Sequence, residues 1–500
     1  MNKTLILQDF QPFLCYNINI KIIQERKPVM AYRYGNRKQI NLFPESMEDY
    51  IAPDDPVRAY DAFIGALDFK KLGIILDPHK VGNSEYHPQA MLKLLVYGYS
   101  YGIRSSRKLE RACHHNLSFV WLTSGLKPDH KTIAEFRRKN QKALADILKQ
   151  CARICIKLNL IEGNTLFLDG TKIRANASIE NTWTKERTQK ALKHIDKNIS
   201  DILTQCDTID DAEKGLGSLV TMDKELKDQK ILKSKVKDIL KELQKEKSLN
   251  TTDPECIRIK KGKNFHAGYN LQSTVDQKHG LILSTDVVRQ TNDLNQFACQ
   301  INQANRILDH KCKVAVADCG YASTDDLEKI ANQGIKVIVP SQRQSLRRKL
   351  SSFAKEHFTY QDDYYLCPEG HKLIPYRLNK GNNRVYKITD KKICLSCPHY
   401  GTCTKSPTGR TISRLLKEEV RQKLEAQYDE PSSQEIYKLR KEKVELPFGH
   451  IKHNLKFYSF LLRGQKGVKA EASIMGTCFN LVRMITILGV PALVKEFNTC

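Results

Sequence analysis

Two short apolar segments, each ending in an aspartate, constrain the fold of this chain most. Residues 165–169 read Thr-Leu-Phe-Leu-Asp, and residues 313–318 read Lys-Val-Ala-Val-Ala-Asp. Apolar runs of this length bounded by turn residues are typical of buried strands. We therefore expect one sheet in which Asp169 and Asp318 both emerge at the tip of a buried strand, at the same edge.

The segments around these strands predict an α/β fold. Residues 324–332 have helical periodicity and residues 336–340 are again apolar, which makes a strand–helix–strand unit with parallel strands. Upstream, the alternating runs 265–275 and 281–288 are separated by a short polar turn and predict an antiparallel pair. We expect a mixed sheet covered by helices.

Two insertions divide this α/β region, which spans residues 161–490. Residues 179–255 are rich in charged residues with Leu and Ile at helical spacing, so they predict a helical insertion. Residues 341–430 carry a cluster of cysteines and form the second insertion. After it, residues 434–456 predict a charged helix and residues 473–488 an apolar helix that packs in the core.

Residues 30–160 predict an all-α domain. Pro88 suits the first turn of one helix, and Asp129 is a typical N-cap of another, on which apolar side chains point inward and Arg137 and Arg138 outward. Short helices ending in a basic one suit a helix-turn-helix-like DNA-binding domain. An ordinary helical packing domain explains the same pattern equally well. Residues 1–29 are interpreted as a possible upstream extension of a reading frame that starts at Met30.

The composition indicates which class of partner the chain binds and which cellular compartment it occupies. Lys and Arg number 82 against 56 Asp and Glu, giving a net charge of +26, and nucleic acid is the commonest polyanion for such a surface. A basic surface that only faces solvent is the alternative. A hydrophobic share of 40% excludes a wholly disordered chain, and no membrane partner is expected. Fifteen irregularly spaced cysteines argue against a disulfide framework and for a reducing, cytoplasmic compartment.

Three acidic residues are candidates for metal chemistry. Asp169 and Asp318 end strands of one sheet, and Glu445 lies on the late charged helix. Carboxylates that converge repel each other unless a divalent cation neutralises them, and oxygen ligands suit Mg²⁺ or Mn²⁺. A pair of such ions serves phosphoryl transfer. An aspartate before a glycine is often only a turn residue, so this spacing alone leaves both readings open.

The four cysteines of the second insertion are candidates for a structural zinc site. Two are separated by two residues, as in a tetrahedral metal knuckle, and the other two flank them in sequence: Cys367, Cys394, Cys397 and Cys403. This spacing predicts a zinc-ribbon-like insertion. Four reduced thiols in a small β insert are the alternative, and neither interpretation gives them a catalytic role.

Four segments resemble bacterial insertion-sequence transposases of the DDE superfamily. Residues 167–177 are similar to the segment around the first aspartate of that family, and residues 316–321 to the segment around the second. Residues 437–452 resemble the Tyr-Arg-Glu-Lys signature around the third acid. Residues 86–96, continuing to Phe136-Arg-Arg, are similar to the family's helical N-terminal domain. The segments occur in the family's order.

This resemblance implies an RNase H-like core that acts on DNA. Asp169, Asp318 and Glu445 would bind two Mg²⁺ (or Mn²⁺) ions, a metal-activated water would cut the DNA at the element end, and the freed 3′-OH would attack target DNA. The partners would be the terminal inverted repeats and target DNA, bound by a homo-oligomer in the bacterial cytoplasm at the nucleoid.

The same resemblance implies DNA contacts by the signature residues. Tyr437, Arg440 and Lys452 would contact the DNA strand near the cleavage point. Arg440 and Glu445 are separated by four residues, where the signature has three, so Glu442 is a rival third acid.

Two other functions remain compatible with the sequence. One is a catalytically silent DNA-binding derivative of a transposase. The other is a metal-dependent, structure-specific nuclease on the same fold, which would cut branched DNA without strand transfer.

Overall fold

The computed structural model describes residues 46–74, 76, 85–210, 216–346, 352–379 and 383–499. The suggested extension of residues 1–29 and the start at Met30 lie outside these residues. Chain contacts group Met47–Cys500 into one compact unit.

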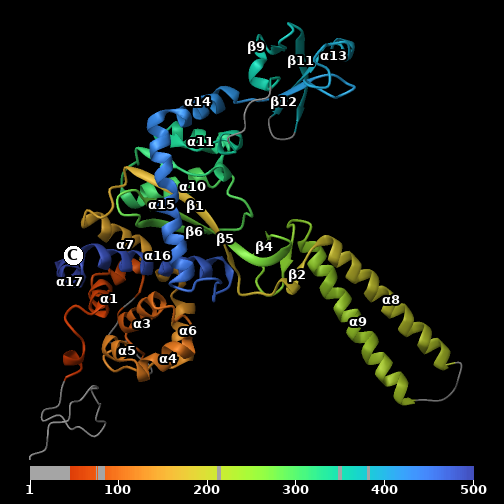
Figure 1. Ribbon diagram of the computed structural model, residues 1–500. Coiled ribbons are helices and arrows are strands. Elements are labelled where there is room, and N and C mark those ends of the chain that lie inside the picture. The colour runs from red at the N-terminus through yellow and green to blue at the C-terminus, as the bar shows by residue number, and fades with distance from the viewer. Residues whose placement is uncertain are drawn as a thin grey trace, which may run out of the picture. The chain divides into compact units, whose positions relative to one another are not determined.

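A six-stranded mixed sheet forms the centre of the α/β region (Figure 1). Its strands are β1 (Thr165–Arg174), β4 (Ile257–Lys261), β5 (Asn264–Asp276), β6 (Ile282–Val288), β7 (Val314–Val316) and β8 (Lys336–Ile338). The strand order is β4-β5-β1-β7-β8, with β6 also paired to β5. β1 is antiparallel to β5 and parallel to β7, and β7 is parallel to β8. The predicted strands are present, and β1 continues past Asp169 because its second half pairs with β5.

Helices from the second half of the chain pack against this sheet, with one exception. They are η3 (Cys319–Tyr321), α10 (Phe297–Leu308), α11 (Thr324–Ala331), α14 (Glu418–Asp429), α15 (Pro431–His453), α16 (Gly464–Leu488) and α17 (Val490–Thr499). The exception is α17, which packs against α16 and against α1 (Pro56–Gly65). The predicted charged helix is α15, and the predicted apolar helix is the second half of α16.

The N-terminal part of the described chain is helical. Its elements are η1 (Met47–Tyr50), α1 (Pro56–Gly65), α2 (Phe69–Leu72), α3 (Pro88–Ser100), α4 (Ser106–His115), α5 (Leu117–Leu122), α6 (His130–Lys139) and α7 (Gln141–Lys157). Pro88 opens α3 as expected, and the Asp129 carboxylate caps α6 by accepting a hydrogen bond from the Thr132 backbone N–H at 2.8 Å.

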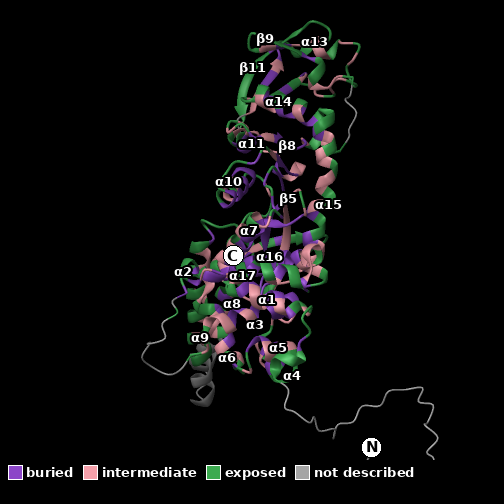
Figure 2. Ribbon diagram, turned by 90° about the vertical axis from the view of Figure 1, so that its left-hand side faces the viewer, coloured by how far each residue is buried: buried purple, intermediate pink, exposed green. Residues whose placement is uncertain are grey.

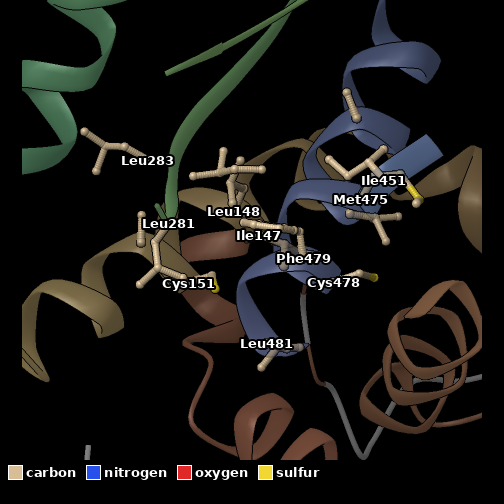
Figure 3. Close-up of a cluster of buried hydrophobic side chains, with 14 of the residues drawn as sticks. Ile147, Leu148, Cys151, Leu281, Leu283, Ile451, Met475, Cys478, Phe479 and Leu481 are labelled. Atoms are coloured by element: carbon tan, nitrogen blue, oxygen red, sulfur yellow. The ribbon is translucent and has the colours of Figure 1, made fainter. Parts of the chain in front are cut away.

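Helix α16 joins the N-terminal helices to the sheet. It packs against α7, β6 and α3 (Figure 3), and the buried colour of Figure 2 runs through this region. Leu148 and Cys151 of α7 meet Met475 and Phe479 of α16 in one continuous core. The two predicted domains therefore share a core rather than each having its own.

Among the described helices, α16 is the one whose length and composition would allow it to cross a membrane. Two thirds of its apolar window (67%) is buried inside the protein. A core helix meets the same criteria, and the packing of α16 is that of a core helix.

The first insertion is a long helical hairpin. Its elements are η2 (Ile179–Asn181), β2 (Thr182–Trp183), α8 (Lys185–Asp210), α9 (Leu216–Glu242) and β3 (Leu249–Asn250). β2 and β3 pair antiparallel and close the base of the hairpin.

The second insertion is a small antiparallel sheet with its own core. Its elements are α12 (Gln342–Ser345), η4 (Lys355–His357), β9 (Thr359–Gln361), β10 (Tyr364–Leu366), β11 (Lys372–Asn379), β12 (Asn383–Ile388), α13 (Lys391–Leu395) and β13 (Thr411–Leu415). The strand order is β13-β12-β11-β10-β9. The fully enclosed core is small, with Phe358, Tyr365, Leu373, Tyr386, Ile388 and Ile412.

Candidate active site

The sheet register places Asp169 and Asp318 side by side. Phe167 of β1 is level with Val316 of the parallel strand β7, so the residues two positions further along each chain meet at the same edge. Asp169 accepts a hydrogen bond from the Gly170 backbone N–H at 2.9 Å. Asp318 caps η3 by accepting one from the Gly320 backbone N–H, also at 2.9 Å.

Arg440 of α15 bridges the two aspartates. Its Nη2 atom lies 3.3 Å from Asp169 Oδ1 and 3.6 Å from Asp318 Oδ2. Helix α15 lies against β1 (Figure 1), which brings the guanidinium to the point where β7 ends beside β1. A single cation thus already sits between the two carboxylates.

The environment of Asp169 favours its protonated form. Burial is the main cause that raises the pKa of Asp169 from 3.8 to about 6, and the neighbouring charges of Asp318 and Asp293 act in the same direction. Arg440 and the Gly170 N–H act in the opposite direction but do not cancel the burial. A second cation near these carboxylates would therefore relieve an unfavourable concentration of negative charge.

This raised pKa predicts that metal-free protein loses stability as the pH rises from about 4 to 6. In that window the unfolded chain has released the Asp169 proton while the folded protein still holds it, so rising pH favours the unfolded state. The loss reaches about 3 kcal/mol and levels off above pH 6. Urea unfolding in EDTA at several pH values, compared with Asp169→Asn, measures it. An identical pH slope in the variant would contradict the assignment.

Glu445 is not brought into contact with the aspartates. It is exposed on α15, and within the described residues no three His, Cys, Asp or Glu side chains are grouped closely enough to hold a metal ion. Lys452, two helical turns further on, donates a hydrogen bond from Nζ to Thr171 Oγ1 of β1. The rival acid Glu442 is exposed as well.

Tyr437 lies one turn before Arg440 on α15. Its ring packs edge-on against Tyr428 of α14, with centroids 5.1 Å apart. Burial raises the pKa of Tyr437 to about 12, so its hydroxyl stays protonated at neutral pH. The hydroxyl is therefore available as a hydrogen-bond donor beside the aspartate pair.

Arg137 was predicted to point outward toward DNA, and this prediction is wrong. It is 5% exposed, and its guanidinium donates to Tyr99 Oη and Arg104 O, both at 2.9 Å, and to Ser106 Oγ. The sequence pattern does not separate the two cases, because a buried Arg whose terminal nitrogens find oxygen acceptors has the same sequence spacing as a solvent-facing one. Arg138 is exposed as predicted, and it forms a bidentate pair with Glu135.

The four predicted zinc ligands lie around one small pocket of the second insertion. All four line it, together with residues of the small core. The backbone N–H of His371 points at Cys367 Sγ at 3.3 Å, and that of Arg410 at Cys394 Sγ at 3.4 Å. Burial raises the pKa of Cys403, and the three other thiols add to this. The four sulfur atoms lie around the same pocket, but in the described part of the chain they are not close enough together to bind one metal ion.

A polar cluster that the sequence did not predict lies behind the aspartates. Asn270 and Gln272, both fully buried on β5, donate hydrogen bonds to the Asp293 carboxylate at 2.7 and 2.8 Å. The signal was available, because two amides at alternate positions of one strand share a face and need hydrogen-bond partners where that face is buried.

Two family models match the chain. Residues 45–139 match the model described as a transposase domain (DUF772), and residues 366–485 match a transposase DDE domain. No curated protein matches. Among solved structures, the piggyBac transposase synaptic complex with hairpin DNA is 9% identical, with a TM-score of 0.33 over 89% of this chain and 79% of that one. That likeness is too low to carry an argument.

The matches and the site agree on one family. The first model covers the helices from η1 to α6. The second covers β11 to β13 of the cysteine-bearing sheet, α14, α15 and most of α16, including the Tyr-Arg-Glu-Lys-like segment. The aspartate pair lies between them in sequence and is bridged by Arg440 of the second match. Both matches are to transposase domains, and together they support a DDE-type transposase.

Proposed function

We propose that this DNA transposase serves a bacterial insertion sequence in the cytoplasm. It would cut phosphodiester bonds at the element ends and join the freed 3′-OH to target DNA. The observation that carries the proposal is the Asp169–Asp318 pair at one sheet edge, already sharing the Arg440 cation. The strand order around β1 supports an RNase H-like core for this chemistry.

The donor set at this edge fits Mg²⁺ or Mn²⁺. Asp169 and Asp318 offer carboxylate oxygens, which are the ligands these ions prefer. When bound, a pair of such ions would neutralise charge on the phosphodiester under attack. We assign Glu445 as the third acid, because it lies on α15 between Arg440, which contacts Asp169, and Lys452, which contacts Thr171.

The residues of α15 would hold the DNA strand. The guanidinium of Arg440 lies at the aspartate pair, and a guanidinium is a charge-assisted donor to phosphate oxygens. Lys452 and the Tyr437 hydroxyl lie along the same helix and offer further donors. Arg138 offers a positive charge on α6. Two element ends must meet before joining, so we expect the active form to contain at least two chains.

A cleavage and strand-transfer assay on the element's own terminal DNA with Mg²⁺ tests the proposal. Metal-dependent cutting followed by joining is the expected result. Tight end binding without cutting would favour the silent derivative. Cutting of branched DNA without joining would favour the nuclease.

We also propose that Cys367, Cys394, Cys397 and Cys403 hold a structural zinc ion. Cys367 and Cys394 support this proposal because each sulfur accepts a backbone N–H···S hydrogen bond, which stabilises a thiolate ligand. The enclosed core of this sheet has only six residues, and small β modules with so little core commonly need a metal staple.

Replacing two of these cysteines should remove the metal. The double variant Cys394→Ser, Cys397→Ser should fall from about one zinc per chain to nearly none and should unfold this sheet at lower temperature. Cys299→Ser, at an exposed cysteine of α10, is the matched control and should keep its zinc. Zinc content measured by mass spectrometry that is equal in all three proteins would refute the site.

A further inference from the structure

Asp293 lies beside the part of β1 that carries Asp169. It lies between β6 and α10, and its Oδ1 atom accepts hydrogen bonds from Asn270 Nδ2 at 2.7 Å and Gln272 Nε2 at 2.8 Å. The Lys172 ammonium lies 3.2 Å from the same oxygen. Two fully buried amides and one ammonium therefore converge on a single carboxylate, which fixes its position.

This carboxylate packs directly against the backbone beside Asp169. A Cβ atom placed on Gly170 would lie 2.5 Å from Gln272 Nε2 and 2.7 Å from Asp293 Oδ1. Such distances are closer than real Cβ atoms approach other heavy atoms. Gly170 thus allows the Asp293–Gln272 pair to press on the peptide that follows Asp169 and to hold it in place.

The same cluster reaches the segment of Asp318. Gln272 Oε1 accepts a hydrogen bond from the hydroxyl of Tyr321, the fully buried last residue of the η3 turn that Asp318 caps. A Cβ on Gly320 would lie 3.7 Å from Asp293 Oδ2. One polar cluster therefore touches the backbone after Asp169 and the turn after Asp318.

We propose that Asp293 is a positioning residue for the aspartate pair. By anchoring Gln272, it holds Gly170 on one side and Tyr321 on the other, so the two carboxylates keep the separation that a divalent cation needs. This inference rests on the proposed metal-binding role of Asp169 and Asp318. Groups that orient metal ligands in this way typically change metal affinity or activity by about 10- to 100-fold when they are replaced.

Calorimetry of Mn²⁺ binding to the full-length protein tests this role independently of catalytic activity. Asp293→Asn keeps the size of the side chain but loses the charge that Lys172 and the two amides converge on. We expect its Mn²⁺ affinity to fall about tenfold or more, and kcat for DNA cleavage to fall while KM for DNA stays within about twofold. The unfolding midpoint in EDTA reports any general loss of structure.

Asp286→Asn is the matched control. Asp286 lies opposite Gln272 across the β5–β6 strand pair, but its carboxylate accepts a hydrogen bond from a different glutamine, Gln300, and pairs with Lys469. Among the described residues, the cluster's hydrogen bonds to Gly170's neighbour Gln272 and to Tyr321 come from Asp293 and Gln272 and not from this carboxylate. We expect its Mn²⁺ affinity and kcat to stay within about twofold of the intact protein. Tyr321→Phe, which removes only the hydroxyl, should shift Mn²⁺ affinity in the same direction as Asp293→Asn.

The outcomes separate the two proposals. Equal Mn²⁺ affinity in Asp293→Asn and the intact protein would overturn the positioning role. Loss of affinity in Asp286→Asn as large as in Asp293→Asn would also overturn it, because a general charge effect would then suffice. Intact protein that binds Mn²⁺ without cutting DNA would refute the proposed function, and the affinities would still decide the role of Asp293. Intact protein that binds no Mn²⁺ would refute both.

Discussion

Asp318→Asn should lower the rate of strand cleavage at least about a thousand-fold and leave DNA affinity within about twofold. Asparagine can still accept the Gly320 N–H that Asp318 accepts at 2.9 Å, so the η3 turn keeps its cap. What is lost is the negative charge beside Asp169, and with it the attraction for a divalent cation. DNA affinity depends instead on the basic surface. Nicking of labelled end DNA in Mg²⁺, with binding followed in EDTA, measures both quantities.

Two further variants sharpen this result. Asp325→Asn removes an exposed aspartate seven residues away that pairs with Lys417, and it should cut DNA normally. The cleavage rate of Glu445→Gln should fall as far as that of Asp318→Asn. The cleavage rate of Glu442→Gln, on the same helix, should stay near that of the intact protein. Full cleavage activity in Asp318→Asn would show that Asp318 has no catalytic role. Loss of cleavage in Glu442→Gln but not in Glu445→Gln would make Glu442 the third acid.

Arg104→Ala should cost about 3–5 kcal/mol of stability, the largest effect expected outside the active site. Arg104 Nη1 lies 2.9 Å from the carboxylate of Glu471, which is fully buried on α16. The same arginine donates to Ser459 O at 2.8 Å, and Glu471 accepts the Leu461 and Leu462 N–H groups. Without Arg104 the carboxylate keeps its burial but loses its cation. Burial already raises the pKa of Glu471.

Urea unfolding at pH 7 measures this loss. Arg138→Ala breaks an exposed pair with Glu135 and should change stability by less than about 1 kcal/mol, which controls for removal of an arginine in general. A loss of under about 1 kcal/mol in Arg104→Ala would show that the pair contributes little to holding α16 against the N-terminal helices.

Local patterns were sufficient to predict the elements that carry the site. The apolar runs that end at Asp169 and Asp318 form strands, the charged segment forms α15, and the Asp129 cap starts α6. Each depends on near neighbours in sequence, through side-chain periodicity and capping. The end of β1 was not predicted, because its continuation past Asp169 depends on pairing with β5. Arg137 was predicted wrongly for the same reason, because its acceptors Tyr99, Arg104 and Ser106 lie more than 30 positions away.

The sequence alone determined which residue types could perform metal-dependent chemistry on DNA, the order of the strands along the chain and the basic character of the surface. Only the tertiary structure decided that Arg440 lies between the two aspartates, and that Asn270, Gln272 and Asp293 form one cluster behind them. These contacts join residues from 21 to 271 positions apart in the chain. They arise from sheet register and from the packing of α15 on β1, and periodicity along a single segment carries no information about either.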